Sequence, residues 1–146
     1  MVLNGYFYVT EKYQVTIYRI CLSARYKWEF LIALRGPWIK DLLTDGNHLY
    51  LIRKKKQISH FDPGTYRVTH FIQYPYEIKK DQIYFSSVLV DSKIYIVEVS
   101  RFIRITIDIF IYDIASQSWS QVPFVSPSLI SLAAVAIDRW IVVTGK

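Results

Sequence analysis

The stretch Asp91-Ser92-Lys93-Ile94-Tyr95-Ile96 decides the fold, because close copies of it recur along the chain. Each copy is a short aromatic and branched run that follows a turn-forming pair such as Asn4-Gly5 or Asp45-Gly46. The positions aligned with Tyr95 are 42, 45 and 47 residues apart, and a period near 45 residues with short strands is typical of β-propeller blades. These aligned positions are Tyr8, Tyr50, Tyr95 and Val142.

A second element recurs in phase with the first. Residues 110–113 (Phe-Ile-Tyr-Asp) lead through a polar turn to Trp119, and residues 60–62 (His-Phe-Asp) lead in the same way to Val68. An Asp before such a turn can accept hydrogen bonds from backbone N–H groups two residues on. The element therefore predicts a strand, a tight turn and a second strand. In the first copy, Cys21 takes the place of Tyr112.

Between these repeated segments the side-chain pattern mostly alternates with a period of two residues, as in a strand, and no segment has a convincing helical period. We therefore predict an all-β fold: antiparallel four-stranded meander blades of a partial β-propeller, with about three blades. We expect one domain over 1–146, with units at approximately 1–34, 35–79, 80–126 and the start of a further unit at 127–146. The expected strands are 6–10, 15–21, 27–33, 38–44, 48–53, 57–61, 67–73, 83–90, 93–98, 107–113, 118–122, 130–137 and 140–144.

The third unit resembles a kelch repeat. In that family a strand ending in Tyr and two apolar residues is followed by Gly-Gly, then Tyr-Asp, six residues and Trp. Tyr112-Asp113 and Trp119 keep this spacing, whereas Glu98-Val99 stands where the glycine pair is expected, so other propeller families stay open. The resemblance implies a propeller that presents binding loops. Closed propellers typically have four to eight blades, so self-association or a missing remainder of the propeller is expected.

Composition narrows the class of protein. Hydrophobic residues make up 52% and aromatic residues 16% of the 146 residues, which favours a packed β-protein over a disordered chain. A single cysteine, Cys21, excludes an internal disulfide and favours a reducing compartment. We find no secretory signal and no apolar run of about 18 residues. The expected location is therefore cytoplasmic, away from the membrane.

Catalytic and metal-binding patterns are missing from the sequence. Nucleophile-elbow, zinc-protease, paired-cysteine and phosphate-loop motifs are absent. His60 and His70 flank one predicted turn and His48 begins a predicted strand, but histidines alone are weak evidence for a metal. Cys21 lies in an apolar context, where cysteine usually packs as a small hydrophobe. We expect no enzyme activity, no cofactor and no metal.

Basic residues cluster in the loops expected at one edge of the blades. In a meander, alternate connections share an edge, so these cations and the turn aspartates Asp45, Asp62 and Asp91 should lie at opposite edges. The net charge of +6 then favours an acidic partner at the basic edge. We predict a non-catalytic protein–protein interaction module; the alternative is a binder of nucleic acid or another polyanion. The candidate binding residues are Arg53, Lys54, Lys55, Lys56, Lys79, Lys80, Arg101 and Arg104.

Overall fold

The computed structural model divides into two compact units, Met1–Tyr74 and Pro75–Lys146, and each is described by itself. Residues 1–10, 16–23, 27–36, 38–54, 57–74, 82–101, 105–124, 133–137 and 140–144 are described. Within these ranges the regular elements are β-strands, without an α-helix. No helix long and apolar enough to cross a membrane occurs among the described residues.

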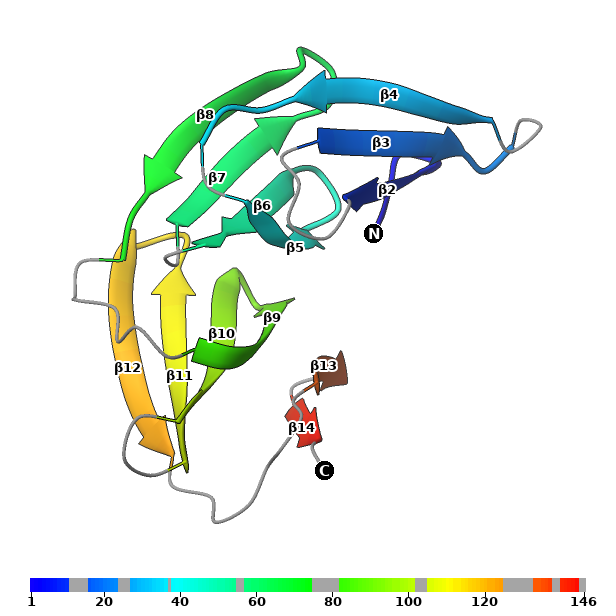
Figure 1. Cartoon of the computed structure of the whole chain (residues 1–146). Coiled ribbons are helices and arrows are strands. Elements are labelled where there is room, and N and C mark those ends of the chain that lie inside the picture. Colours follow the sequence, from blue (N-terminus) through cyan, green and yellow to red (C-terminus); the bar gives the residue numbers. More distant parts are fainter. Residues whose placement is uncertain are drawn as a thin grey trace. The chain divides into compact units, whose positions relative to one another are not determined.

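The first unit contains two four-stranded antiparallel sheets, each with its strands in sequential order (Figure 1). Sheet 1 consists of β1 (Val2–Leu3), β2 (Tyr6–Thr10), β3 (Thr16–Cys21) and β4 (Trp28–Ala33). Sheet 2 consists of β5 (Ile39–Thr44), β6 (Leu49–Arg53), β7 (Gln57–Asp62) and β8 (Arg67–Ile72). This up-and-down order is the meander of a propeller blade.

One apolar core joins the two sheets of the first unit. Sheet 1 contributes Tyr8 and Ile17, which are 2% and 0% exposed, and sheet 2 contributes Leu49, Leu51 and Phe61, each 0% exposed. Alternate positions of a strand point to opposite faces of a sheet, so each sheet uses one face for this core. Burial of these branched and aromatic side chains stabilises the pair of sheets.

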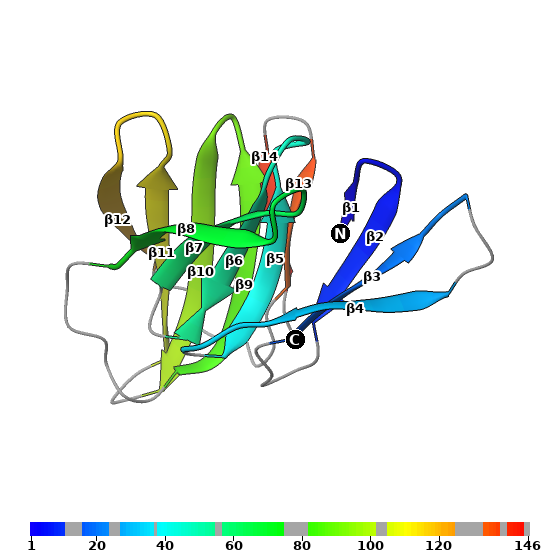
Figure 2. The same ribbon diagram turned by 90° about the horizontal axis from the view of Figure 1, so that it is seen from above.

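The second unit contains one four-stranded and one two-stranded antiparallel sheet (Figure 2). Sheet 3 consists of β9 (Gln82–Val90), β10 (Lys93–Arg101), β11 (Ile105–Asp113) and β12 (Ser118–Phe124), and sheet 4 of β13 (Ala133–Ile137) and β14 (Trp140–Thr144). Ala134 packs on a core of Val97, Val99 and Ile107. Its backbone N–H also donates a 2.9 Å hydrogen bond to the Ser86 hydroxyl. Sheet 4 is therefore held against sheet 3 by packing and by a polar contact.

Turn chemistry explains where the strands reverse. Asn4 and Gly5 have φ of 50° and 75°, and Asp91 and Ser92 have φ of 48° and 60°. Two successive positive φ values characterise the tight hairpin turns whose twist matches that of paired strands, and Asn, Asp and Gly tolerate them best. Three of the four repeated pairs thus mark turns between strands; the fourth, Asp138-Arg139, lies outside the described residues.

The prediction of an all-β fold with four-stranded antiparallel blades is confirmed. Each predicted strand has a counterpart, with bounds that differ by up to three residues, and the predicted positions 15 and 130–132 lie outside the described residues. The two-residue strand β1 was not predicted, and it pairs with β2 to complete sheet 1. The assignment of 1–146 to one domain stays a prediction.

Candidate functional site

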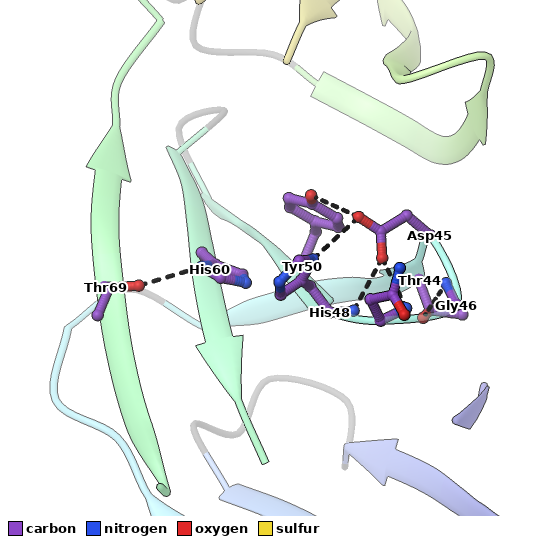
Figure 3. Close-up of polar contacts among 8 residues, drawn as sticks. Thr44, Asp45, Gly46, His48, Tyr50, His60 and Thr69 are labelled. Carbon is purple, nitrogen blue, oxygen red and sulfur yellow. Dashed lines mark hydrogen bonds and ion pairs between the residues drawn. The ribbon is translucent and has the colours of Figure 1, made fainter. Parts of the chain in front are cut away.

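A polar cluster closes the turn between β5 and β6 (Figure 3). Asp45 Oδ1 accepts hydrogen bonds of 2.8 Å from the backbone N–H groups of Asn47 and His48. Its Oδ2 accepts a 2.9 Å bond from the Tyr50 hydroxyl and lies 3.1 Å from His48 Nδ1. The Tyr50 ring stacks on His60 with centroids 5.6 Å apart. The cluster therefore ties one turn to two neighbouring strands.

The charge of Asp45 is stabilised by this geometry. Partial burial opposes ionisation, but the hydrogen bonds from Asn47, His48 and Tyr50 outweigh it and hold the pKa of the Asp45 carboxyl at about 2. A carboxylate that is ionised throughout the physiological range and surrounded by donors is suited to closing a turn. It is poorly suited to act as a general base, which needs a pKa near the working pH.

The same device recurs at the β7–β8 and β11–β12 turns. Asp62 Oδ1 accepts a 2.8 Å hydrogen bond from the Gly64 N–H, and Asp113 Oδ1 accepts a 2.9 Å bond from the Ser116 N–H. The predicted turn role of these aspartates is confirmed. A role that repeats from sheet to sheet is structural, because a catalytic group would be particular to one position.

Arg53 does not lie on an exposed basic loop. It is the last residue of β6, only 1% exposed, and its Nη1 donates a 2.9 Å hydrogen bond to the backbone carbonyl oxygen of Arg35. A Cβ built at Gly36, whose φ is +110°, would lie 3.0 Å from the same Nη1. Arg53 therefore holds the connection that leads into β5, and the expectation that it faces solvent is wrong.

Lys54 forms an exposed cation–aromatic pair with Trp38, the last residue of this connection before β5. Lys54 Nζ lies 5.0 Å from the centroid of the Trp38 ring, within the range of a cation–π interaction. The Lys54 backbone N–H donates a 2.9 Å hydrogen bond to the Trp38 carbonyl oxygen, which aligns the two residues. Trp38 remains 46% exposed. We name these two residues the Lys54–Trp38 pair.

The predicted separation of charges holds within sheet 2. Arg53 pairs with Gln57 at one edge, while Leu49 pairs with Phe61 at the other, next to the Asp45 and Asp62 turns. Lys54 therefore lies at the edge opposite those aspartates. In sheet 3, Arg101 pairs with Ile105 at the edge opposite Asp91; only the backbone of Arg101 is described. Lys55, Lys56, Lys79, Lys80 and Arg104 lie outside the described residues.

His60 and His70 are not directly opposite each other in sheet 2. The Cα partner of His60 is Thr69 rather than His70, and His60 Nδ1 lies 3.1 Å from the Thr69 hydroxyl. In the described part of the chain, no three His, Cys, Asp or Glu side chains gather as metal ligands would. The register also shows that Ile20 rather than Cys21 occupies the place of Tyr112, so that alignment was off by one residue.

An exposed aromatic face on sheet 1 was missed by the sequence analysis. Phe7, Trp28 and Phe30 are 36%, 50% and 60% exposed, and the Phe7 and Trp28 rings lie 6.5 Å apart. In β2 and β4 nearly every position is apolar, so the alternation gave no signal about which face is buried. The strand register could have shown that these side chains share one face, because Phe7 is opposite Ile20, which is opposite Trp28.

The fold defines the class of protein: an all-β chain of four-stranded antiparallel blades. No protein-family model matches the chain, and no curated protein matches it. Solved structures do. "Crystal Structure of the N-terminal Domain of Nup159" gives a TM-score of 0.47 at 11% identity, covering 94% of this chain and 35% of that chain. A structure of an S. cerevisiae Dbp5 variant bound to Nup159, a Gle1 variant, IP6 and ADP gives 0.48, with the same identity and coverage. The chain thus spans about a third of their length.

Proposed function

We propose that this chain is a kelch-like propeller module that binds an acidic segment of a protein partner and carries out no catalysis. The observation that carries the proposal is the Lys54–Trp38 pair, in which an exposed cation lies 5.0 Å from the centroid of an exposed indole ring. A carboxylate of the partner would pair with Lys54, and an adjacent apolar side chain would pack on Trp38. Tryptophan is among the residues that contribute most to protein interfaces.

The surroundings of the pair support a binding role. The buried Arg53 holds the connection by its hydrogen bond to the Arg35 carbonyl oxygen, so Trp38 is presented by a loop anchored on a buried strand. Loops held by a rigid scaffold are common positions for binding residues. The turn aspartates lie at the opposite edge of the sheet, so their charge does not compete with Lys54 for an acidic partner.

A binder of nucleic acid is the alternative, because bases also stack on exposed aromatic rings. The burial of Arg53 removes one expected cation for either kind of partner, so it does not separate the two alternatives. Two fluorescent probes of equal charge separate the alternatives: a Glu-rich peptide containing one Phe, and a single-stranded oligonucleotide. We expect the peptide to bind the full chain in an anisotropy titration, and the oligonucleotide to bind more weakly.

The matched variants are Trp38→Ala and Trp28→Ala, because the two indoles are 46% and 50% exposed in the same unit. Trp38→Ala should weaken peptide binding by at least about tenfold, as expected for an aromatic anchor, while Trp28→Ala should leave it unchanged. Binding of the oligonucleotide alone, with a steep loss in salt, would favour the polyanion reading instead. Equal effects of the two variants on peptide binding would contradict the assignment of the binding site to the Lys54–Trp38 pair.

A further inference from the structure

One rule governs how the sheets pack within each unit. In the first unit, the sheet 1 face that carries Tyr8 covers the sheet 2 face that carries Leu49 and Leu51. In the second unit, the sheet 3 face that carries Val97 and Val99 covers the sheet 4 face that carries Ala134. In both units the earlier sheet presents its covering face to the later sheet.

The repeat shows that the two examples are equivalent. Tyr95, two positions before Val97, lies on the covering face of sheet 3 and aligns with Tyr8. Ala134 lies next to Val135, the partner of Val142, and therefore on the opposite face of sheet 4. Ala134 thus lies on a covered face, as Leu51 does in sheet 2. We use covering face for the side with the Tyr8-type position, and covered face for the opposite side.

In sheet 1, the face opposite Tyr8 corresponds to the covered face of sheets 2 and 4, but here it carries exposed side chains. Phe7 lies beside Tyr8 and therefore on the opposite face, as Leu49 lies beside Tyr50. Ile20 and Trp28 continue the row of Phe7 across the sheet, and Tyr18 and Phe30 form the next row. Trp28 and Phe30 are 50% and 60% exposed. Aromatic side chains gathered in this way on a protein surface mark a contact site.

In sheet 4, the exposed side chains lie on the face of the Tyr8-type position, which is the covering face. Val142 occupies the Tyr8-type position and pairs with Val135; the two side chains are 41% and 49% exposed. Among the described residues, sheet 1 and sheet 4 thus have exposed faces of opposite kinds, and the two kinds match the pair that packs together inside both units. A surface that fits a different surface of an identical molecule gives a head-to-tail contact.

We propose that a second copy of this chain packs the Val135–Val142 face of its sheet 4 onto the Phe7–Trp28–Phe30 face of sheet 1. The contact extends the packing rule of both units from one molecule to the next. It uses a face of the sheet, whereas the proposed binding of an acidic partner uses an edge, so the two proposals stand or fall separately.

Sedimentation velocity of the full chain over a range of concentrations tests this contact. The two disrupting variants are Phe30→Lys and Val142→Lys, both at exposed positions, and the control is Val122→Lys, at a position on β12 that is 48% exposed. We expect wild type and the control to associate, and each disrupting variant alone to remain monomeric with an unchanged circular dichroism spectrum. An equimolar mixture of the two disrupting variants should form a one-to-one dimer, because each variant keeps the face that the other has lost.

Three results would overturn the proposal. A wild-type chain that stays monomeric at every concentration would show that no second copy binds. Association of Val142→Lys alone would show that sheet 1 pairs with itself or with another surface. Failure of the mixture to dimerise, when wild type associates and both variants are folded, would show that the two faces are not complementary.

Discussion

The guanidinium group of Arg53 donates a 2.9 Å hydrogen bond to the carbonyl oxygen of Arg35, eighteen residues earlier in the chain. Desolvation by burial lowers the pKa of Arg53, as expected for a cation taken out of water. The neighbouring Gly36 leaves room for the guanidinium, since a Cβ there would approach it to 3.0 Å. The bond connects the end of one strand to the loop that carries Trp38.

Replacement of Arg53 should destabilise the fold. Arg53→Met keeps most of the apolar volume but leaves the Arg35 carbonyl oxygen without this donor, which costs about 2 kcal/mol in free energy of unfolding. Urea unfolding measures the change. Lys54→Met is the matched control, because Lys54 is exposed and surface changes usually stay within about 0.5 kcal/mol. Equal stability of both variants would contradict the role assigned to Arg53.

Gly36→Ala tests the space around the same guanidinium. The backbone φ of +110° is unfavourable for any residue with a Cβ, and the added methyl would press on Arg53 Nη1. We expect a loss of about 1–2 kcal/mol, read from the midpoint of urea unfolding. Gly5→Ala provides the comparison, because nothing lies within 4 Å of a Cβ there although φ is +75°. The loss at Gly36 should exceed that at Gly5.

Asp45→Asn should make the stability of the chain less dependent on pH in acid. The folded pKa of Asp45, about 2, lies below its ordinary value of 3.8, so its contribution is present above pH 3.8 and is lost as the pH falls through about 2. Because the carboxyl is partly exposed, we expect about 1 kcal/mol near neutral pH. Thermal melting of both proteins from neutral pH downward measures the difference. A gap that stays constant down to pH 2 would contradict the assignment.

Trp119 and Trp28 occupy equivalent positions on the outer strands of sheets 3 and 1. Trp119 is partly buried and its ring centroid lies 5.1 Å from that of Tyr112, whereas Trp28 is 50% exposed. Trp119→Ala should therefore cost about 3 kcal/mol, at the low end for truncation of a buried tryptophan. Trp28→Ala should cost less than about 1 kcal/mol in the isolated chain. Urea unfolding of the two variants compares them, and equal losses would contradict the packing described for Trp119.

The features that could be predicted from the sequence are local. Turn pairs such as Asn4-Gly5 and Asp91-Ser92 have a backbone chemistry that few residues share, so they located the hairpins. The strand β1 could not be predicted, because two residues are too few to show alternation. Its existence depends on pairing with β2, which is a tertiary effect.

The site was less predictable than the fold, for a physical reason. Arg53 adjoins a run of three lysines, so its charge suggested a loop, yet its environment is set by Arg35 and Gly36 in a distant part of the sequence. The pairing of Lys54 with Trp38 depends on the same long-range contact between strand end and loop. Charge patterns predict which residues reach the same edge, but burial at that edge depends on packing between elements.

The most direct measurement of the central claim is the ratio of two dissociation constants for the Glu-rich peptide. Lys54→Glu reverses the charge of the Lys54–Trp38 pair, and Lys27→Glu makes the same change at an exposed position beside the β3–β4 connection, at the edge of sheet 1 away from the β2–β3 connection. If the acidic partner binds at the pair, Lys54→Glu should weaken binding at least about tenfold more than Lys27→Glu, since a close like charge replaces an attractive one. Equal dissociation constants for the two variants would contradict the account.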